Sequence, residues 1–288
     1  MLVFRRIYDE LLQLKLVDDD CLHVPVNFYP DRRILKSVHC PDFVDAFCDG
    51  RLDAKALRRI GFPWSEALVK RTCCEISGTL LTAEIALQQG IAVSCAGGTH
   101  HAHYDFGSGF CIFNDLAITA RSLISRGLVT RVAIIDLDVH QGDGTASLCG
   151  AWPDVYTFSM HAGSNFPARK ARSDLDVALP DGTNDDAYLR ELATHVPTIL
   201  RSFNPGLVLY DAGVDIHAED TLGNLAVTDG GLYRRDALVL DQCAAMGIPV
   251  AGFVGGGYAK DLGVLARRHA QLARAANDVF ASRSDHAG

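Results

Sequence analysis

Short apolar stretches alternate along the chain with longer segments in which apolar residues recur every three or four positions. The short stretches predict buried β-strands and the longer ones predict amphipathic helices, because these elements have side-chain periods of 2 and 3.6 residues. Strands are expected at residues 91–95, 131–135, 155–159, 207–210 and 249–254, and helices at 65–89, 114–126, 185–202, 231–246 and 260–281.

Uninterrupted apolar strands that alternate with helices are typical of a parallel sheet covered on both faces. The chain of 288 residues has no internal repeat and no low-complexity linker. We therefore expect one α/β domain over residues 1–288, with a single doubly wound parallel sheet and helices on both faces. Residues 282–288 are expected to form a disordered tail.

The composition is that of an ordinary globular protein, with 48% hydrophobic and 22% charged residues. The net charge of −8 argues against direct nucleic-acid binding, which needs a basic surface, and favours cationic substrates. The nine cysteines include no CxxC pair, so neither a disulfide framework nor a thiolate zinc site is indicated. Without a signal peptide or an apolar run of about 20 residues, we expect a soluble, reduced, cytoplasmic protein with no membrane segment.

Residues that can bind metals or transfer protons follow four of the predicted strands, in the segments 97–101, 136–143, 211–217 and 255–258. Ligands of open parallel sheets bind at the carboxyl ends of the strands, so these segments should meet at one edge. Asp138 and His140, with a third ligand, would form a three-point site with an open position, as catalytic zinc requires. Alone, this Asp-x-His pair is equally compatible with a capped loop.

The adjacent histidines His100 and His101 follow a Gly-Gly turn. Asp136 and Asp143 are available as their partners, and a carboxylate that accepts a ring N–H fixes the histidine tautomer. For Asp211 we expect a structural role as a helix cap.

The motifs are similar to those of the histone deacetylase superfamily, which shares its fold with arginases and acetylpolyamine amidohydrolases. The matching text is Gly-Gly-Thr-His-His-Ala at 97–102, Gly-Ser-Gly-Phe-Cys-Ile-Phe-Asn-Asp at 107–115, Ile-Asp-Leu-Asp-Val-His-Gln-Gly-Asp-Gly at 135–144, Asp-Ala-Gly-Val-Asp at 211–215, Leu-Gly at 222–223 and Gly-Gly-Gly-Tyr at 255–258. The bacterial-type class IV members resemble it further in segments 166–176 and 182–189.

The resemblance implies that one zinc ion per chain is bound by Asp138, His140 and Asp215. It also implies a structural potassium ion near the zinc. The residues at the potassium site would be Asp136, Asp138, His140, Ser159 and Met160.

The resemblance assigns the proton transfers to His101, with Asp143 behind it, and makes His100, paired with Asp136, the second histidine. Tyr258 would hydrogen-bond the substrate carbonyl. The channel for the acyl-lysine side chain would be lined by Gly109, Phe110 and Phe166. This residue set predicts a zinc-dependent deacylase that acts on N-ε-acyl-lysine in proteins or peptides, with acetyl or longer acyl groups as substrates.

The chain departs from the family pattern at its beginning. Family members usually begin with a strand and a rim loop, whereas residues 4–16 are already helical in pattern. The N-terminal strand and the rim loop are therefore expected to be missing, which would leave the mouth of the site open.

Three other functions compete with this prediction. An acetylpolyamine amidohydrolase uses the same catalytic set, so the sequence leaves acylated polyamines open as substrates. A binuclear arginase-type site needs a bridging aspartate where this chain has Gly142, and His217 is expected only to support the site or face solvent. A non-catalytic binding protein on this fold is disfavoured because every catalytic residue is present.

Overall fold

Six parallel strands form one sheet in the computed structural model, which describes residues 2–18, 21–26 and 29–284. Every neighbouring pair of these strands is parallel. In order across the sheet the strands are β1 (Ile91–Val93), β6 (Val250–Phe253), β5 (Leu207–Asp211), β2 (Val132–Asp136), β3 (Val155–Ala162) and β4 (Leu175–Leu179). The predicted parallel sheet is confirmed, with β4 as an additional strand.

Burial explains the sequences of the central strands, whereas the edge strand β1 is apolar although it is only partly buried. The central strands β2 and β5 are buried along their whole length, which is why they are uninterrupted apolar stretches. Strand β4 lies at the edge and alternates between more and less exposed side chains. Its sequence, Leu-Asp-Val-Ala-Leu, therefore lacks an uninterrupted apolar run.

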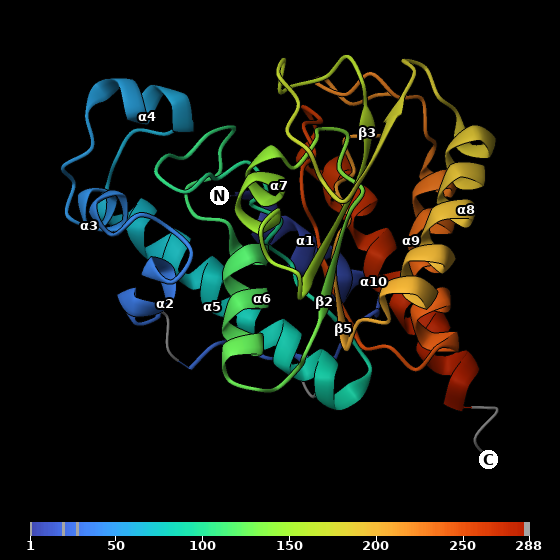
Figure 1. Cartoon of the computed structure of the whole chain (residues 1–288). Coiled ribbons are helices and arrows are strands. Elements are labelled where there is room, and N and C mark those ends of the chain that lie inside the picture. The colour runs from blue at the N-terminus through green and yellow to red at the C-terminus, as the bar shows by residue number, and fades with distance from the viewer. Residues whose placement is uncertain (1, 19–20, 27–28, 285–288) are drawn as a thin grey trace.

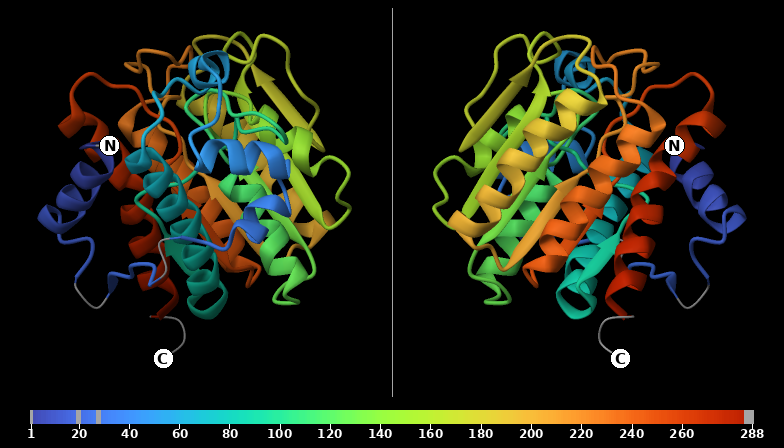
Figure 2. Two further views of the ribbon diagram at one scale, coloured as in Figure 1. Left: turned by 90° about the vertical axis from the view of Figure 1, so that its left-hand side faces the viewer. Right: turned by 90° about the vertical axis from the view of Figure 1, so that its right-hand side faces the viewer.

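The two faces of the sheet are covered by different helices (Figures 1 and 2). Helices α8 (Asp185–Phe203), α9 (Asp229–Ala245) and α10 (Leu262–Ser284) share one hydrophobic core with the sheet. Helices α5 (Glu66–Gln89) and α6 (Asp115–Ser125) share a second core on the opposite face. The predicted layering is confirmed, and the predicted helices agree with the observed ones to within three residues at each end.

Four of these helices begin with a polar side chain that accepts a hydrogen bond from a backbone N–H three residues later, which satisfies a donor that the helix itself cannot pair. The capping residues are Ser65, Asn114, Asn184 and Thr228.

Five further helices are described: α1 (Leu2–Gln13), α2 (Arg32–Lys36), α3 (Pro41–Cys48), α4 (Ala54–Ile60) and α7 (Asp143–Cys149). Helix α1 overlaps the helical pattern at residues 4–16, and the other four are too short to give a clear pattern in the sequence. Helix α1 packs against α10. Helix α10 continues to Ser284, so its end overlaps the tail expected at 282–288, of which residues 285–288 lie outside the described part of the chain. None of the described helices is long and apolar enough to cross a bilayer.

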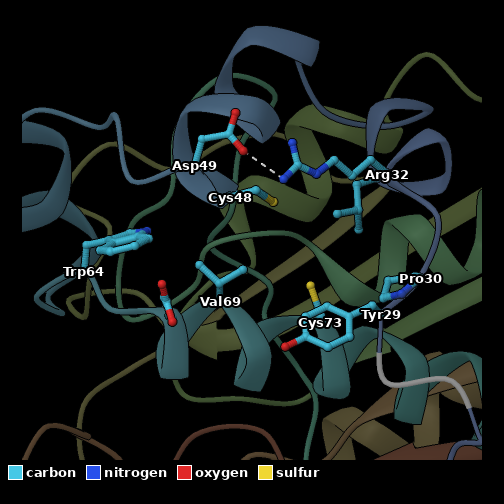
Figure 3. Close-up of a pocket in the computed structure, with 10 residues that line it drawn as sticks. Tyr29, Pro30, Arg32, Cys48, Asp49, Trp64, Val69 and Cys73 are labelled. Atoms are coloured by element: carbon cyan, nitrogen blue, oxygen red, sulfur yellow. Dashed lines mark hydrogen bonds and ion pairs between the residues drawn. The ribbon is translucent and has the colours of Figure 1, made fainter.

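A cavity of about 480 Å³ lies between α2, α3 and α5 (Figure 3). Its wall includes Trp64, Val69 and Cys73, and the Arg32–Asp49 ion pair crosses one side. None of the residues that line it belongs to the site expected from the sequence.

His39 lies in the loop before α3, and its side chain is fully buried. It connects this loop to two later segments of the chain by hydrogen bonds. Its Nε2 accepts a hydrogen bond from the backbone N–H of Asn114 at 2.9 Å. The other ring nitrogen, Nδ1, therefore carries the proton and donates it to the carbonyl of His103 at 2.8 Å. Only the neutral imidazole can make both bonds.

Lowering the pH from 7 to 5 is expected to reduce the free energy of unfolding, in part through His39. Burial lowers the pKa of His39 to about 4, whereas a histidine in an unfolded chain titrates near 6.5. The contribution of neutral His39 is thus complete above pH 6.5 and is lost as the pH falls toward 4, with a loss of about 2 kcal/mol at pH 5. Urea denaturation at pH 7 and pH 5 measures the change in the free energy of unfolding.

His39→Gln should show a smaller pH dependence than the wild type, whereas the control His195→Gln, at a partly exposed position of α8, should not. Equal pH dependence in all three proteins would contradict the assignment to His39.

Candidate metal centre

The residues expected at the site lie at the carboxyl ends of four adjacent strands, β1, β6, β5 and β2. His100 and His101 follow β1, and Asp136 is the last residue of β2. Asp215 follows β5 and Tyr258 follows β6. The parallel topology thus places segments from four distant parts of the sequence at one edge.

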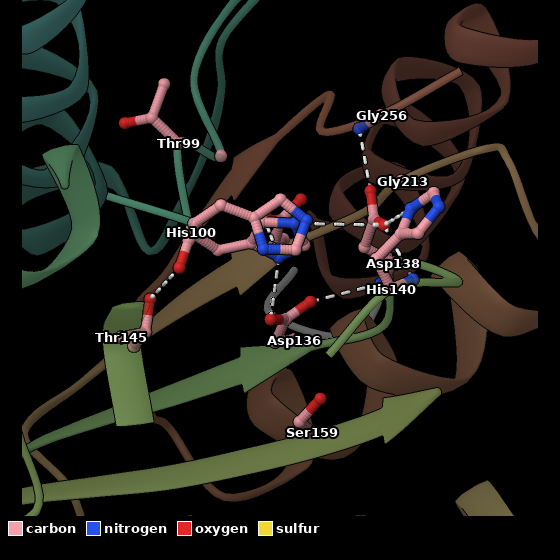
Figure 4. A network of polar contacts seen from close by, with 12 residues as sticks. Thr99, His100, Asp136, Asp138, His140, Thr145, Ser159, Gly213 and Gly256 are labelled. Carbon is pink, nitrogen blue, oxygen red and sulfur yellow. Dashed lines mark hydrogen bonds and ion pairs between the residues drawn. The ribbon is translucent and has the colours of Figure 1, made fainter. Parts of the chain in front are cut away.

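The three predicted zinc ligands converge, and Figure 4 shows Asp138 and His140 side by side. The Nδ1 atom of His140 lies 3.0 Å from Oδ1 of Asp138 and 3.1 Å from Oδ2 of Asp215. All three side chains are buried, and their ligand atoms lie within 4.8 Å of one another. Imidazole nitrogen and carboxylate oxygen are both ligand types that zinc accepts, so this cluster could hold a metal ion.

The electrostatics of this cluster fit a cation. Burial alone would lower the pKa of His140, but hydrogen bonds and charge from Asp138 and Asp215 outweigh it and raise that pKa to about 10. Burial and the charge of Asp138 raise the pKa of Asp215 to about 7. Without an ion, the cluster therefore retains protons, which a divalent cation would displace.

Glycines leave room around these ligands. A Cβ atom at Gly256 would lie 2.4 Å from Oδ2 of Asp215 and 2.5 Å from Oδ2 of Asp138. The N–H of Gly256 instead donates to Oδ2 of Asp138 at 2.8 Å (Figure 4). This explains the use of the Gly-Gly-Gly run that follows β6.

The space at position 142 bears on the arginase-type alternative. A Cβ atom at Gly142 would lie 2.2 Å from Oδ2 of Asp136, so the bridging aspartate of such a site does not fit there. His217 is also occupied elsewhere, because its Nδ1 accepts the N–H of Glu219 and its Nε2 lies 3.3 Å from Asp229.

His100 lies between two carboxylates. Its Nδ1 is 2.9 Å from Oδ2 of Asp136, as the sequence predicts, and 3.6 Å from Oδ2 of Asp211. The expectation that Asp211 caps a helix is wrong, because Asp211 is the last residue of β5 and no helix begins there. Its carboxyl group is fully buried, and burial raises its pKa well above the usual value.

His100, Asp136 and Asp211 therefore form a second compact group whose atoms could hold a cation. Within the described residues, neither oxygen of Asp211 has a hydrogen-bond partner. The sequence did contain a signal for this role. Asp211 ends the predicted strand that is followed by Asp215, only four residues later.

His101 is buried beside His100, with the ring centroids 4.1 Å apart. Its Nδ1 lies 2.7 Å from Oδ1 of Asp143, which begins α7. Burial and the positive charge of His100 lower the pKa of His101 to about 4, so its ring is neutral near pH 7. A neutral ring whose Nδ1–H points at a carboxylate keeps the lone pair of Nε2 for accepting a proton.

Aromatic rings lie beside His101 and His140. The ring of Phe166 lies edge-on to His101 at 4.9 Å between centroids, and the ring of Tyr258 lies 6.1 Å from that of His140. Phe110 lies 6.2 Å from Tyr258, and both phenylalanines are about half exposed. Three aromatic rings thus lie close to the two histidines His101 and His140.

Gly109 lies against the ring of His101, because a Cβ atom there would be 2.6 Å from Cδ2 of His101. The three residues expected along a channel, Gly109, Phe110 and Phe166, thus each lie beside His101 or Tyr258.

Of the five residues expected at a potassium site, Asp136, Ser159 and Met160 lie on the neighbouring strands β2 and β3, and Asp138 and His140 follow β2. Asp136 of β2 and Ser159 of β3 are paired in register, and Ser159 and Met160 are buried. The Ser159 hydroxyl also lies 3.0 Å from Nδ1 of His161. The potassium ion itself stays a prediction.

Two residues that were not predicted from the sequence hold Tyr258 in place. Oδ2 of Asp220 accepts the backbone N–H of Tyr258 at 2.7 Å. The hydroxyl of Thr221 donates to the carbonyl of Tyr258 at 2.6 Å. A cavity of about 610 Å³ borders Tyr258 on this side, with Leu222 and Leu262 in its wall.

Arg235 of α9 is a further residue that was not predicted from the sequence. It is fully buried and donates to the carbonyls of Ala212, at 3.0 Å, and of Gly213, in the loop that carries Asp215. Its charge is paired with Asp236 at 2.9 Å. One arginine in a helix gives no sequence signal, since only the packing shows what it contacts.

Comparison with known proteins places the chain among related sequences. A family model described as "Histone deacetylase domain" matches residues 3–275. An uncharacterized protein from Picosynechococcus sp. is 53% identical over 277 residues, which are 96% of this chain and 92% of that protein.

Two named relatives match a shorter segment. Histone deacetylase 2 from Arabidopsis thaliana is 36% identical over 189 residues, covering 65% of this chain and 49% of the relative. The acetoin utilization protein AcuC from Staphylococcus aureus is 35% identical over 199 residues, covering 64% and 51% respectively. The matched part thus spans about half the length of these two relatives.

Among solved structures, an acetylpolyamine aminohydrolase from Burkholderia pseudomallei superimposes with a TM-score of 0.75 at 19% identity, covering 95% of this chain and 89% of that one. At this identity the likeness establishes the fold. Together with the family match over residues 3–275, it leads to one conclusion: the chain belongs to the histone deacetylase domain family, on the arginase/deacetylase fold.

Proposed function

We propose that this protein is a zinc-dependent deacylase that hydrolyses the amide of N-ε-acyl-lysine in proteins or peptides. The observation that carries the proposal is the convergence of three buried metal-ligand side chains beside the His101–Asp143 pair. Membership of the histone deacetylase domain family supports the same reaction class.

In this proposal Asp138, His140 and Asp215 hold the ion. A zinc ion in this position supplies a Lewis acid, which polarises a carbonyl group and acidifies water. His101 accepts the proton of the attacking water at Nε2 and later donates it to the departing amine. Asp143 holds the ring of His101 in the tautomer that this requires.

The other residues bind and orient the substrate. The hydroxyl of Tyr258 donates a hydrogen bond to the carbonyl oxygen as negative charge develops there. Phe110 and Phe166 contact the methylene groups of the lysine side chain on either side. His100, between Asp136 and Asp211, presents a positive charge near the reacting groups.

The substrate is the finer part of the proposal. The net charge of −8 favours a cationic partner, such as a lysine-rich protein segment. The similarity of segments 166–176 and 182–189 to class IV members supports acceptance of longer acyl groups as well as acetyl. An acetylated polyamine is the competing substrate, because it would be cleaved by the same residues.

The test compares kcat/KM of the zinc-loaded protein for an acetyl-lysine peptide, a long-chain acyl-lysine peptide and acetylated spermidine. We expect one of the peptides to be the best substrate, with activity lost on chelation and restored by zinc. A preference for the polyamine of more than about tenfold, which is about 1.4 kcal/mol of transition-state binding, would overturn the lysine assignment. Activity that survives complete metal removal would overturn the zinc assignment.

A further inference from the structure

Asp143 has two histidine partners, one on each carboxylate oxygen. Its Oδ1 lies 2.7 Å from Nδ1 of His101, and its Oδ2 lies 3.1 Å from Nε2 of His103. The sequence motifs paired Asp143 with His101 alone. His103 is thus a second histidine that reaches the same proton-transfer group from the opposite side.

The ring of His103 is held in one orientation. It stacks on the ring of Phe106 at 4.4 Å between centroids, with an interplanar angle of 21°. The guanidinium of Arg59 lies over the same Phe106 ring at 4.5 Å. This packing directs Nε2 of His103 at Asp143 and leaves the His103 side chain 18% exposed.

The backbone of His103 is fixed as well. Its N–H donates to the carbonyl of Phe106 at 2.9 Å, and its own carbonyl accepts Nδ1–H of the buried His39 at 2.8 Å. Because both the ring and the backbone are held, the bond to Asp143 is part of a built arrangement rather than a contact of a loose surface side chain.

We propose that His103 is a positioning residue for the reaction proposed above, on which this inference rests. Its Nε2–H holds the Asp143 carboxylate in the orientation in which the other oxygen accepts Nδ1–H of His101. Without this donor the carboxylate can rotate toward solvent, and His101 loses the bond that fixes its tautomer and ring plane. Among the described residues, His103 has no hydrogen bond or ion pair with Asp138, His140 or Asp215, the proposed metal ligands.

Two substitutions separate the N–H donor from the aromatic packing. His103→Phe keeps a ring against Phe106 but removes the donor, whereas His103→Gln keeps an N–H near the position of Nε2 and removes the ring. Zinc-loaded wild type, both variants and the control His195→Gln are compared by steady-state kinetics and zinc content. A second readout is the NMR resonance of the His101 Nδ1–H proton.

For His103→Phe we expect kcat to fall about tenfold, the lower end of the range for a supporting residue. KM should change less than about twofold, since His103 does not contact substrate, and zinc content should be unchanged. The His101 Nδ1–H resonance should broaden or disappear. His103→Gln should retain most of the wild-type kcat and this resonance, and His195→Gln should match the wild type.

Equal losses in His103→Phe and His103→Gln, or a His103→Phe variant with wild-type kcat and resonance, would overturn the role of His103. A wild type that cleaves none of the amides contradicts the proposed function instead. In that case the NMR readout alone tests the role of His103. Loss of the His101 Nδ1–H resonance in His103→Phe together with its retention in His103→Gln supports this role, and any other pattern refutes it.

Discussion

His101→Ala is expected to lower kcat by about 10²–10⁴-fold, the usual contribution of a general acid–base group. His101 is the histidine whose Nδ1 is directed at Asp143 and whose ring adjoins Phe166. Nε2 of its neutral ring is the proposed base. Alanine has no group that could accept the proton from water or donate it to the departing amine. The measurement is kcat on the best acyl-lysine peptide, with zinc content determined on the same samples.

Zinc should remain bound in His101→Ala, because His101 is not among the three converging ligands. Asp138→Asn is the contrasting variant, and it should lose both activity and zinc. His100→Ala should also be severely impaired, through lost orientation and charge. If His101→Ala kept more than about a tenth of the wild-type kcat, the assignment of the base would be wrong.

Removing one hydroxyl group in Tyr258→Phe is expected to lower kcat by about 10²-fold. Loss of a single donor to a developing oxyanion typically has an effect of this size. The substitution should leave the ring in place, because Asp220 and Thr221 hold the backbone of residue 258 and not its hydroxyl. The loss should therefore appear in kcat, measured on the same peptide.

Tyr104→Phe is the matched control, because Tyr104 is exposed and outside the predicted catalytic set. It should retain full activity. A wild-type kcat in Tyr258→Phe would mean that this tyrosine only packs against Phe110 and the metal ligands.

The pattern of apolar and polar residues was sufficient to predict the parallel sheet and the long helices. The central strands β2 and β5 are apolar because both faces of the sheet are covered there. The two edge strands are both only partly buried, and β1 was predicted because its residues are all apolar, whereas Asp176 interrupts the apolar run of β4. Short helices such as α7 are held by tertiary contacts more than by their own periodicity.

The candidate site residues could be predicted from the sequence because they lie in short motifs that directly follow predicted strands. Parallel topology predicts that segments 97–101, 136–143, 211–217 and 255–258 meet at one edge of the sheet. The resemblance to the histone deacetylases then singled out Asp215 as the partner of Asp138 and His140, and these three side chains do converge. Their chemical roles stay predictions until the variants above are measured.

The partners of these residues were decided only by the tertiary structure. Asp211 lies beside His100 because β5 and β2 end in register, and Arg235 reaches the loop of Asp215 from a helix on the covering layer. His103 contacts Asp143 because the carboxylate of Asp143, at the start of α7, lies between His101 and His103. A contact between segments tens of residues apart depends on side-chain direction and on how layers pack, and single-sequence periodicity carries neither.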